Sequence, residues 1–213
     1  MTILFDLDGT LIDSTDAILE SFSVAFERLN SPKADDNDVK ALIGFPLDEM
    51  FLQLGVPDNR KWDYVAEYKK HYRKVSKQKT ELLPMVKETL ELASSFATVG
   101  VVTTKTRLYS IELLEHFEIM HHFKTVVGRE SVNNPKPHKE PIELALNQLN
   151  RSKDNSWIVG DTILDAKSAN SAEIKCAGVT SGYGTLEDLK RETDYIFKNA
   201  YDAVKYIESI REV

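Results

Sequence analysis

Apolar residues along the chain fall into short continuous runs that alternate with longer segments of helical spacing. Each run ends in polar or glycine-containing residues, which is typical of strands buried in a parallel sheet. The segments between the runs place an apolar residue at every third or fourth position, for example at Val86, Leu90 and Ala93. Strands that alternate with helices indicate βαβ units. The predicted strands span residues 2–7, 98–103, 124–128, 156–160, 174–180 and, with a weaker signal, 195–197.

One long segment interrupts this alternation. Residues 14–80 carry no strand signal, and a crossover between parallel strands needs only about a dozen residues. We therefore expect an α/β fold in which residues 1–13 and 81–213 form a core with a Rossmann-like parallel sheet, and residues 14–80 form an inserted all-helical cap. The helical segments within the insertion span residues 18–29, 46–54 and 61–78.

The cap must join the core through two short hinges, because no Gly/Ser-rich linker is present. The expected hinges lie near Asp13 and near residues 82–84. At the other end of the chain, Ala200, Val204 and Ile207 lie on one side of a predicted closing helix.

The composition is that of a folded globular protein of 213 residues, with 42% hydrophobic and 29% charged side chains. The net charge of -7 argues against nucleic acid as a partner, since that binding depends on Lys and Arg neutralising phosphates. No apolar run has the length of a membrane span. The acidic residue Asp6 lies where a signal peptide would have a basic segment followed by a long apolar stretch. We therefore expect a cytoplasmic protein without a membrane partner. The single cysteine, Cys176, lies in an apolar run and is expected to be buried.

Basic side chains concentrate in one part of the predicted cap. Residues 61–80 contain seven basic and two acidic side chains, a net charge of +5. This helix could steer anionic substrates toward the site, or it could simply present a solvated face. Tyr64, Tyr68 and Tyr72 share one side of it and are expected to pack inside the cap.

Two carboxylates follow the first predicted strand, in the sequence FDLDGTL at residues 5–11. In open α/β sheets ligands bind beyond the carboxyl ends of the strands. If the extended conformation persists, Asp6 and Asp8 point to the same side, where they repel each other unless a cation or proton compensates. An acidic turn that bends at Gly9 is the structural alternative, but a turn does not need two acids after a hydrophobic strand.

With Thr10, this segment resembles the DxDGT motif of the phosphatases in the haloacid dehalogenase superfamily. Three further segments resemble the other motifs of that family, in the same order: residues 101–105 with Thr103, residues 134–137 with Lys136, and residues 160–165. The resemblance covers essentially the whole chain. The early helical insertion is similar to the C1 cap of the phosphoglycolate phosphatase-like and β-phosphoglucomutase-like subgroup.

The resemblance implies a Mg²⁺-dependent phosphatase that hydrolyses small-molecule phosphate monoesters. Asp6 would be the nucleophile that forms an aspartyl-phosphate, and Asp8 the general acid and base. Thr103, the Thr104 backbone N–H and Lys136 would bind the phosphoryl oxygens.

The same resemblance implies a Mg²⁺ site. Its ligands would be the Asp6 carboxylate, the Asp8 backbone carbonyl and Asp161, since Mg²⁺ prefers hard oxygen ligands. Asp165 would contribute to this site by orienting the waters that Mg²⁺ binds.

Substrate contacts are expected in two places. Gly9 and Thr10 belong to the first motif, beside the proposed nucleophile. Gly44 and Phe45 resemble the cap loop that reaches into the site of phosphoglycolate phosphatases, although a Gly-Phe-Pro turn can also be a simple connection between helices.

Alternatives to a phosphatase of this type remain open at the level of sequence. A phosphosugar mutase would resemble its relatives in carrying a His early in the first cap helix, and residues 16–20 contain none. A pyrophosphatase would use the same motifs. A receiver-like phosphoacceptor module would be about half as long, with its phosphoacceptor after a middle strand. The expected partner is a small phosphorylated metabolite. Neither the identity of this metabolite nor the oligomeric state of the protein follows from the sequence.

Overall fold

A computed structural model describes residues 1–211 and shows a six-stranded sheet in which all neighbouring strands are parallel. The strand order is β5-β4-β1-β6-β7-β8, which places the first strand in the middle. This confirms the predicted α/β class, and each strand lies within two residues of its predicted bounds. The strands are β1 (Thr2–Phe5), β4 (Thr98–Val102), β5 (Phe123–Val127), β6 (Ser156–Gly160), β7 (Lys175–Val179) and β8 (Ile196–Phe197).

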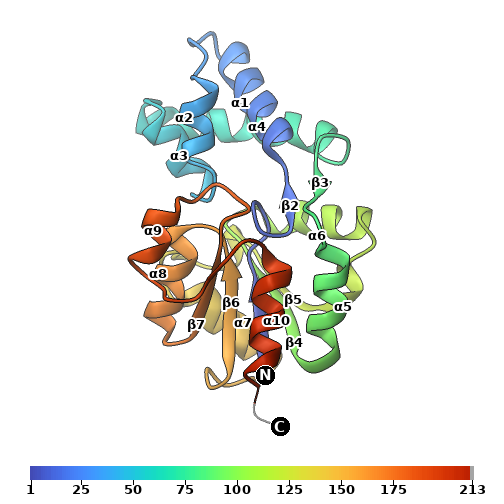
Figure 1. Ribbon diagram of the computed structural model, residues 1–213. Coiled ribbons are helices and arrows are strands. Elements are labelled where there is room, and N and C mark those ends of the chain that lie inside the picture. Colours follow the sequence, from blue (N-terminus) through green and yellow to red (C-terminus); the bar gives the residue numbers. More distant parts are fainter. Residues whose placement is uncertain (212–213) are drawn as a thin grey trace.

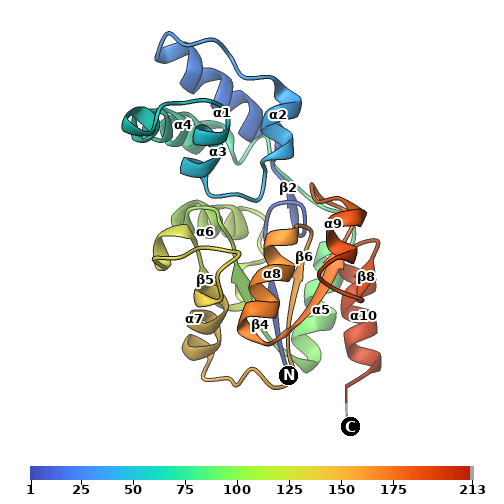
Figure 2. The same cartoon turned by 90° about the vertical axis from the view of Figure 1, so that its left-hand side faces the viewer.

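Helices cover both faces of this sheet, as the continuous apolar runs require. Because side chains alternate along β1, Ile3 and Phe5 belong to one apolar cluster and Leu4 to the cluster on the other face. The first cluster includes side chains of α5 (Val86–Phe96), α6 (Arg107–His116) and α10 (Ala200–Ser209), and the second includes those of α7 (Glu140–Leu149) and α8 (Ile163–Ala172). Figure 2 shows α8 and α10 on opposite sides of the strands.

The inserted segment forms four helices that lie over the carboxyl ends of the strands (Figure 1). They are α1 (Thr15–Arg28), α2 (Asp36–Ala41), α3 (Leu47–Gln53) and α4 (Lys61–Val75). They share a separate apolar cluster in which Phe22, Phe51 and Tyr68 pack ring against ring. The expected packing of Tyr64, Tyr68 and Tyr72 inside the cap is confirmed, since all three are at most 7% exposed.

Two strands of two residues each, β2 (Ile12–Asp13) and β3 (Glu81–Leu82), pair antiparallel where the chain enters and leaves the insertion. Both expected hinges lie here. The pairing itself is not predicted from the sequence, because two residues are too few to show a periodic pattern. The division of the chain at residues 14 and 80 stays a prediction.

The shorter elements are α9 (Leu186–Lys190) and the 3₁₀ turns Asp58–Arg60, Met120–His122 and Arg129–Ser131. Cys176 lies in β7 and is 3% exposed, as expected. None of the helices within residues 1–211 is both long enough and apolar enough to cross a membrane.

Candidate active site

Three parallel strands deliver the predicted site residues to one edge of the sheet. Asp6 directly follows β1, Thr103 directly follows β4, and Asp161 directly follows β6. In the register, Phe5 lies opposite Val101 on one side and Val159 on the other, so the three strands end at nearly the same level. The backbone therefore brings together residues that are far apart in the sequence.

Four charged side chains are buried together at this edge: Asp6, Lys136, Asp161 and Asp165 are all at most 3% exposed. Lys136 Nζ lies 2.9 Å from Asp6 Oδ1 and 2.5 Å from Asp165 Oδ1. It also donates to the Val102 carbonyl at 3.2 Å. One lysine thus neutralises only part of the charge of three carboxylates.

The imbalance changes the acidity of these groups. Burial raises the pKa of Asp6 to about 7, even though Lys136 acts in the opposite direction. Burial and then repulsion by Asp6 and Asp165 raise the pKa of Asp161 well above its ordinary value. Burial would lower the pKa of Lys136, but Asp165 and Asp6 more than offset this and raise it.

The residues of the cluster fit a hard divalent cation. Asp6, Asp161 and Asp165 each offer a carboxylate oxygen within 4.8 Å of the others. Within residues 1–211, Asp6 Oδ1 has no aligned hydrogen-bond donor, because the ammonium group of Lys136 approaches it as an ion pair without hydrogen-bond geometry. A buried oxygen that accepts no hydrogen bond and an excess of negative charge are what a cation bound by carboxylates would compensate.

Gly9 and Thr10 lie against Asp161. The Thr10 hydroxyl donates to Asp161 Oδ1 at 3.0 Å, and the Tyr183 backbone N–H donates to Oδ2 at 2.8 Å. Gly9 has φ +81°, and a Cβ there would lie 2.3 Å from Asp161 Oδ2, so only glycine fits. Thr10 therefore holds a carboxylate of the cluster and Gly9 leaves room for it, and the contact of both residues with substrate stays a prediction.

Asp165 has both of its oxygens engaged by the protein. Its Oδ1 meets Lys136, and its Oδ2 accepts from the Thr162 N–H at 3.1 Å and from the Thr162 hydroxyl at 2.7 Å. These contacts suit a residue that positions Lys136 and orients neighbouring groups.

Asp8 lies apart from the buried cluster and is half-buried. The Ser14 hydroxyl donates to its Oδ1, and Lys105 Nζ lies 3.0 Å from its Oδ2. The same ammonium group lies 4.7 Å from the centre of the Tyr72 ring, which belongs to the cap. Sequence reasoning assigned no role to Lys105, although its position directly after Thr103 and Thr104 could have indicated one.

The loop at Gly44 touches the core at two places. The Thr104 hydroxyl donates to the Gly44 carbonyl at 2.8 Å. Gly44 has φ +112°, and a Cβ there would lie 2.9 Å from Thr162 Cγ2. The loop therefore joins the segments that follow β4 and β6.

Thr103 is 4% exposed, and its hydroxyl accepts from the Lys105 backbone N–H at 3.1 Å.

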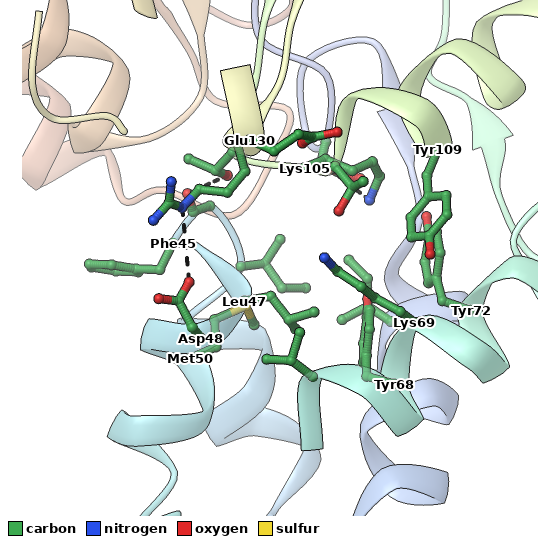
Figure 3. A pocket seen from close by; sticks show the side chains of 18 of the residues that line it. Phe45, Leu47, Asp48, Met50, Tyr68, Lys69, Tyr72, Lys105, Tyr109 and Glu130 are labelled. Carbon is green, nitrogen blue, oxygen red and sulfur yellow. Dashed lines mark hydrogen bonds and ion pairs between the residues drawn. The ribbon is translucent and has the colours of Figure 1, made fainter. Parts of the chain in front are cut away.

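Between the cap and the core lies a cavity of about 220 Å³ (Figure 3). Asp8, Thr104 and Lys105 line it from the core, and Gly44 and Phe45 line it from the cap. Of the residues predicted for the site, the structure thus brings Asp6, Lys136, Asp161 and Asp165 into one buried cluster and the others around it. Their individual roles stay predictions.

A buried carboxylate cluster at the carboxyl end of a central parallel strand, beneath a helical insertion, is typical of α/β enzymes whose site lies at the edge of the sheet. The sequence profile of the haloacid dehalogenase-like hydrolases matches residues 3–179, and the chain belongs to this family.

Relatives with assigned names support the same conclusion. The chain is 33% identical to a pyrophosphatase PpaX of Halalkalibacterium halodurans, over 97% of this chain and 96% of that one. It is 30% identical to a phosphoglycolate phosphatase of Salmonella typhi, over 94% and 89% of the two chains. A haloacid dehalogenase-like family hydrolase of Streptococcus pneumoniae has the same fold, with a TM-score of 0.87 and 28% identity over 96% of this chain and 97% of that one. The resemblance to the phosphatases of the superfamily is confirmed.

Proposed function

We propose that this chain is a Mg²⁺-dependent phosphatase that hydrolyses small phosphate monoesters through an aspartyl-phosphate on Asp6. The observation that carries the proposal is the position of Asp6, which ends the central strand, is 3% exposed and lies 2.9 Å from Lys136 Nζ. A carboxylate held beside a fixed ammonium group can attack phosphorus while that group binds a phosphoryl oxygen.

In the first step the Asp6 carboxylate attacks phosphorus and the bond from phosphorus to the ester oxygen breaks. Asp8, in its protonated form, gives its proton to that leaving oxygen. In the second step Asp8 takes a proton from water, whose oxygen attacks phosphorus, and the bond to Asp6 breaks to release phosphate. Thr103, the Thr104 N–H and Lys136 hold the phosphoryl oxygens in both steps.

Asp6, the Asp8 carbonyl and Asp161 would hold Mg²⁺, which would supply positive charge beside the phosphoryl group. Asp165 supports this arrangement through its 2.5 Å contact with Lys136. The substrate would be a small phosphorylated metabolite in the cytoplasm, and the net charge of -7 disfavours nucleic acid.

The competing functions are less well supported. The first cap helix, α1, contains no His, whereas phosphosugar mutases of this superfamily resemble one another in carrying a His early in that helix. A receiver-like module is disfavoured by four helices over the phosphoacceptor. Hydrolysis of pyrophosphate, suggested by the name of one relative, is an outcome that the assay below would detect.

An assay of phosphate release from a panel of esters, with Mg²⁺, with EDTA and with Ca²⁺, tests the proposal. We expect turnover with Mg²⁺ only, because Ca²⁺ accepts longer and bidentate carboxylate contacts that would occupy both oxygens of Asp6. In Asp8→Asn with p-nitrophenyl phosphate, whose leaving group needs no proton, mainly the second step should slow, so mass spectrometry of the quenched variant should detect a phosphoryl adduct on Asp6. Full turnover in EDTA, or an adduct elsewhere, would contradict the proposal.

A further inference from the structure

The cavity beneath the cap begins at the residue proposed to protonate the leaving oxygen. Asp8 forms part of its wall, whereas Asp6 does not. If the phosphoryl group binds at Asp6, the rest of the ester extends past Asp8 into this space. The chemistry of the wall therefore describes the alcohol part of the substrate.

Most of this wall is apolar or aromatic. Leu47 and Met50 of α3 and Val65 of α4 supply aliphatic surface from the cap. Tyr68, Tyr72 and Tyr109 add ring surface on the opposite side of the space from Leu47 and Met50 (Figure 3). Tyr68 and Tyr72 stack on each other with their ring centres 5.5 Å apart, so this side of the wall is aromatic.

The charged groups of the wall are mostly paired with one another. Lys105 pairs with Asp8 at 3.0 Å and Arg129 with Asp48 at 3.9 Å. Glu130 accepts two contacts of 3.0 Å from the Arg107 backbone N–H.

Lys69 differs from these groups. Its ammonium group points into the open space, and no carboxylate within residues 1–211 lies at ion-pair distance from it. Lys70, the next residue, instead points to Glu67 at 3.7 Å. Among the described residues of the wall, Lys69 is thus a cation without a carboxylate partner, and it lies beside mainly apolar surface.

We propose that the substrate is a phosphate monoester of an alcohol with an aromatic or similarly sized apolar body, carrying an acidic or hydrogen-bond-accepting substituent that Lys69 binds. This inference rests on the proposed phosphatase function. Glycolate and orthophosphate, the leaving groups of phosphoglycolate and pyrophosphate, are compact anions without apolar surface. They would leave the walls of Leu47, Met50 and Tyr68 unmatched.

The size of the cavity limits the body of the substrate. Its volume of about 220 Å³ is below the range of roughly 300–1,000 Å³ typical of sites for drug-sized ligands. A single ring on a short arm suits this space.

The first experiment compares substrates of matched reactivity. Ethyl phosphate and 2-phenylethyl phosphate are both esters of primary alcohols, and only the second carries a ring. We expect kcat/KM with Mg²⁺ to be at least about tenfold higher for 2-phenylethyl phosphate, as burial of a ring predicts. The value of kcat/KM for 2-phenylethyl phosphate should also exceed the values for 2-phosphoglycolate and for pyrophosphate.

Variants of the wall then locate the effect. Leu47→Asn should lower the ratio of kcat/KM between the phenylethyl and ethyl esters by about fivefold, since it replaces apolar wall with an amide. Leu52→Asn makes the same change on α3 at a residue that does not line the cavity and should keep the wild-type ratio.

The role of Lys69 needs a substrate with an acid on its ring. For 2-(4-carboxyphenyl)ethyl phosphate, Lys69→Met should raise KM about fivefold or more, while its effect on the uncharged phenylethyl ester is smaller. Lys70→Met is the matched control and should leave both KM values at the wild-type level.

The possible results separate the two proposals. If no ester is hydrolysed, acetyl phosphate included, the phosphatase function itself fails. If phosphate esters are hydrolysed but kcat/KM for ethyl phosphate, phosphoglycolate or pyrophosphate equals or exceeds kcat/KM for the phenylethyl ester, the phosphatase function stands and the proposed substrate class is wrong. Equal effects of Lys69→Met on both aromatic esters would remove the acidic substituent from the proposal.

Discussion

The two sides of the cavity are built from opposite kinds of interior. Among residues 1–211, the buried charged side chains all lie at the edge of the sheet, in Asp6, Lys136, Asp161 and Asp165. The interior of the cap is aromatic, with Phe51 in contact with Phe22, Tyr64 and Tyr68. Burial of rings stabilises a fold, whereas burial of like charges opposes it.

This difference separates reactivity from selectivity. Carboxylates lie close together at the edge of the sheet, which opposes folding and, under the proposed function, suits groups that act on phosphorus. The cap presents a hydrophobic wall that can distinguish one alcohol from another without taking part in the reaction. Substitutions on the two sides should therefore have different kinetic signatures.

The largest effect is expected from Asp6→Asn. The amide keeps the shape of the side chain but is no nucleophile, so kcat should fall by about 10³-fold or more while the fold persists. Steady-state kinetics and the circular dichroism spectrum measure the two quantities. Turnover close to that of the wild type in a folded variant would show that the reaction does not use this carboxylate.

A smaller effect is expected from Asp8→Ala, with a loss of about 10²-fold in kcat for alkyl phosphates, typical of a lost general acid. p-Nitrophenyl phosphate has a leaving group that needs no proton, so the formation of the aspartyl-phosphate should be less affected with this ester. Rapid-quench measurement of that first step for both esters is the test. Equal losses would assign Asp8 a role in binding instead of proton transfer.

On the cap side, Gly44→Val should act mainly on KM. A side chain at φ +112° is strained, and its Cβ would press on Thr162 Cγ2 at 2.9 Å, so the loop must shift. We expect KM to rise about tenfold for esters that fill the cavity, with a smaller change for acetyl phosphate. If kcat for acetyl phosphate falls as much as kcat/KM for the larger esters, the loop supports the chemistry and the comparison between the two sides fails.

Much of the sheet edge could be predicted from the sequence for a physical reason. A parallel sheet aligns the ends of its strands, so short apolar runs that end in Asp6, Thr103 and Asp161 predict that these residues meet. The helical insertion could also be predicted, because the segment is longer than a crossover needs and its apolar residues have helical spacing.

Contacts that depend on how the loops cross could not be predicted. The pairing of Lys105 with Asp8 requires the loops after β1 and β4 to meet. The contact of Lys105 with the Tyr72 ring requires the cap to lie against the core, which no local pattern encodes. The approach of the Tyr183 N–H to Asp161, across 22 positions of sequence, is of the same kind. Such contacts arise only when separate elements pack together.

The smallest effect concerns the stability of the metal-free protein. Asp161 is fully buried, and burial and then repulsion by Asp6 and Asp165 raise its pKa well above the ordinary value. An Asp whose pKa is raised by folding destabilises the folded state once the pH exceeds its unfolded value. The free energy of unfolding therefore falls as the pH rises from that value toward the raised one.

Asp161→Asn should relieve this repulsion. The amide oxygen can still accept from the Tyr183 N–H, and the Thr10 hydroxyl can turn to accept from the amide nitrogen, so the contacts of the side chain survive. In EDTA we expect a gain of about 1 kcal/mol, or about 2–4 °C in Tm, that is larger at pH 8 than at pH 5. Mg²⁺ should raise the Tm of the wild type and have less effect on the variant, because the variant lacks one of the proposed ligands. Asp154→Asn, at an exposed position, controls for the loss of a charge as such. A variant less stable than the wild type at pH 8 in EDTA would show that the buried carboxylates are balanced without a cation, and the contrast between a strained sheet edge and a stabilising cap would not hold.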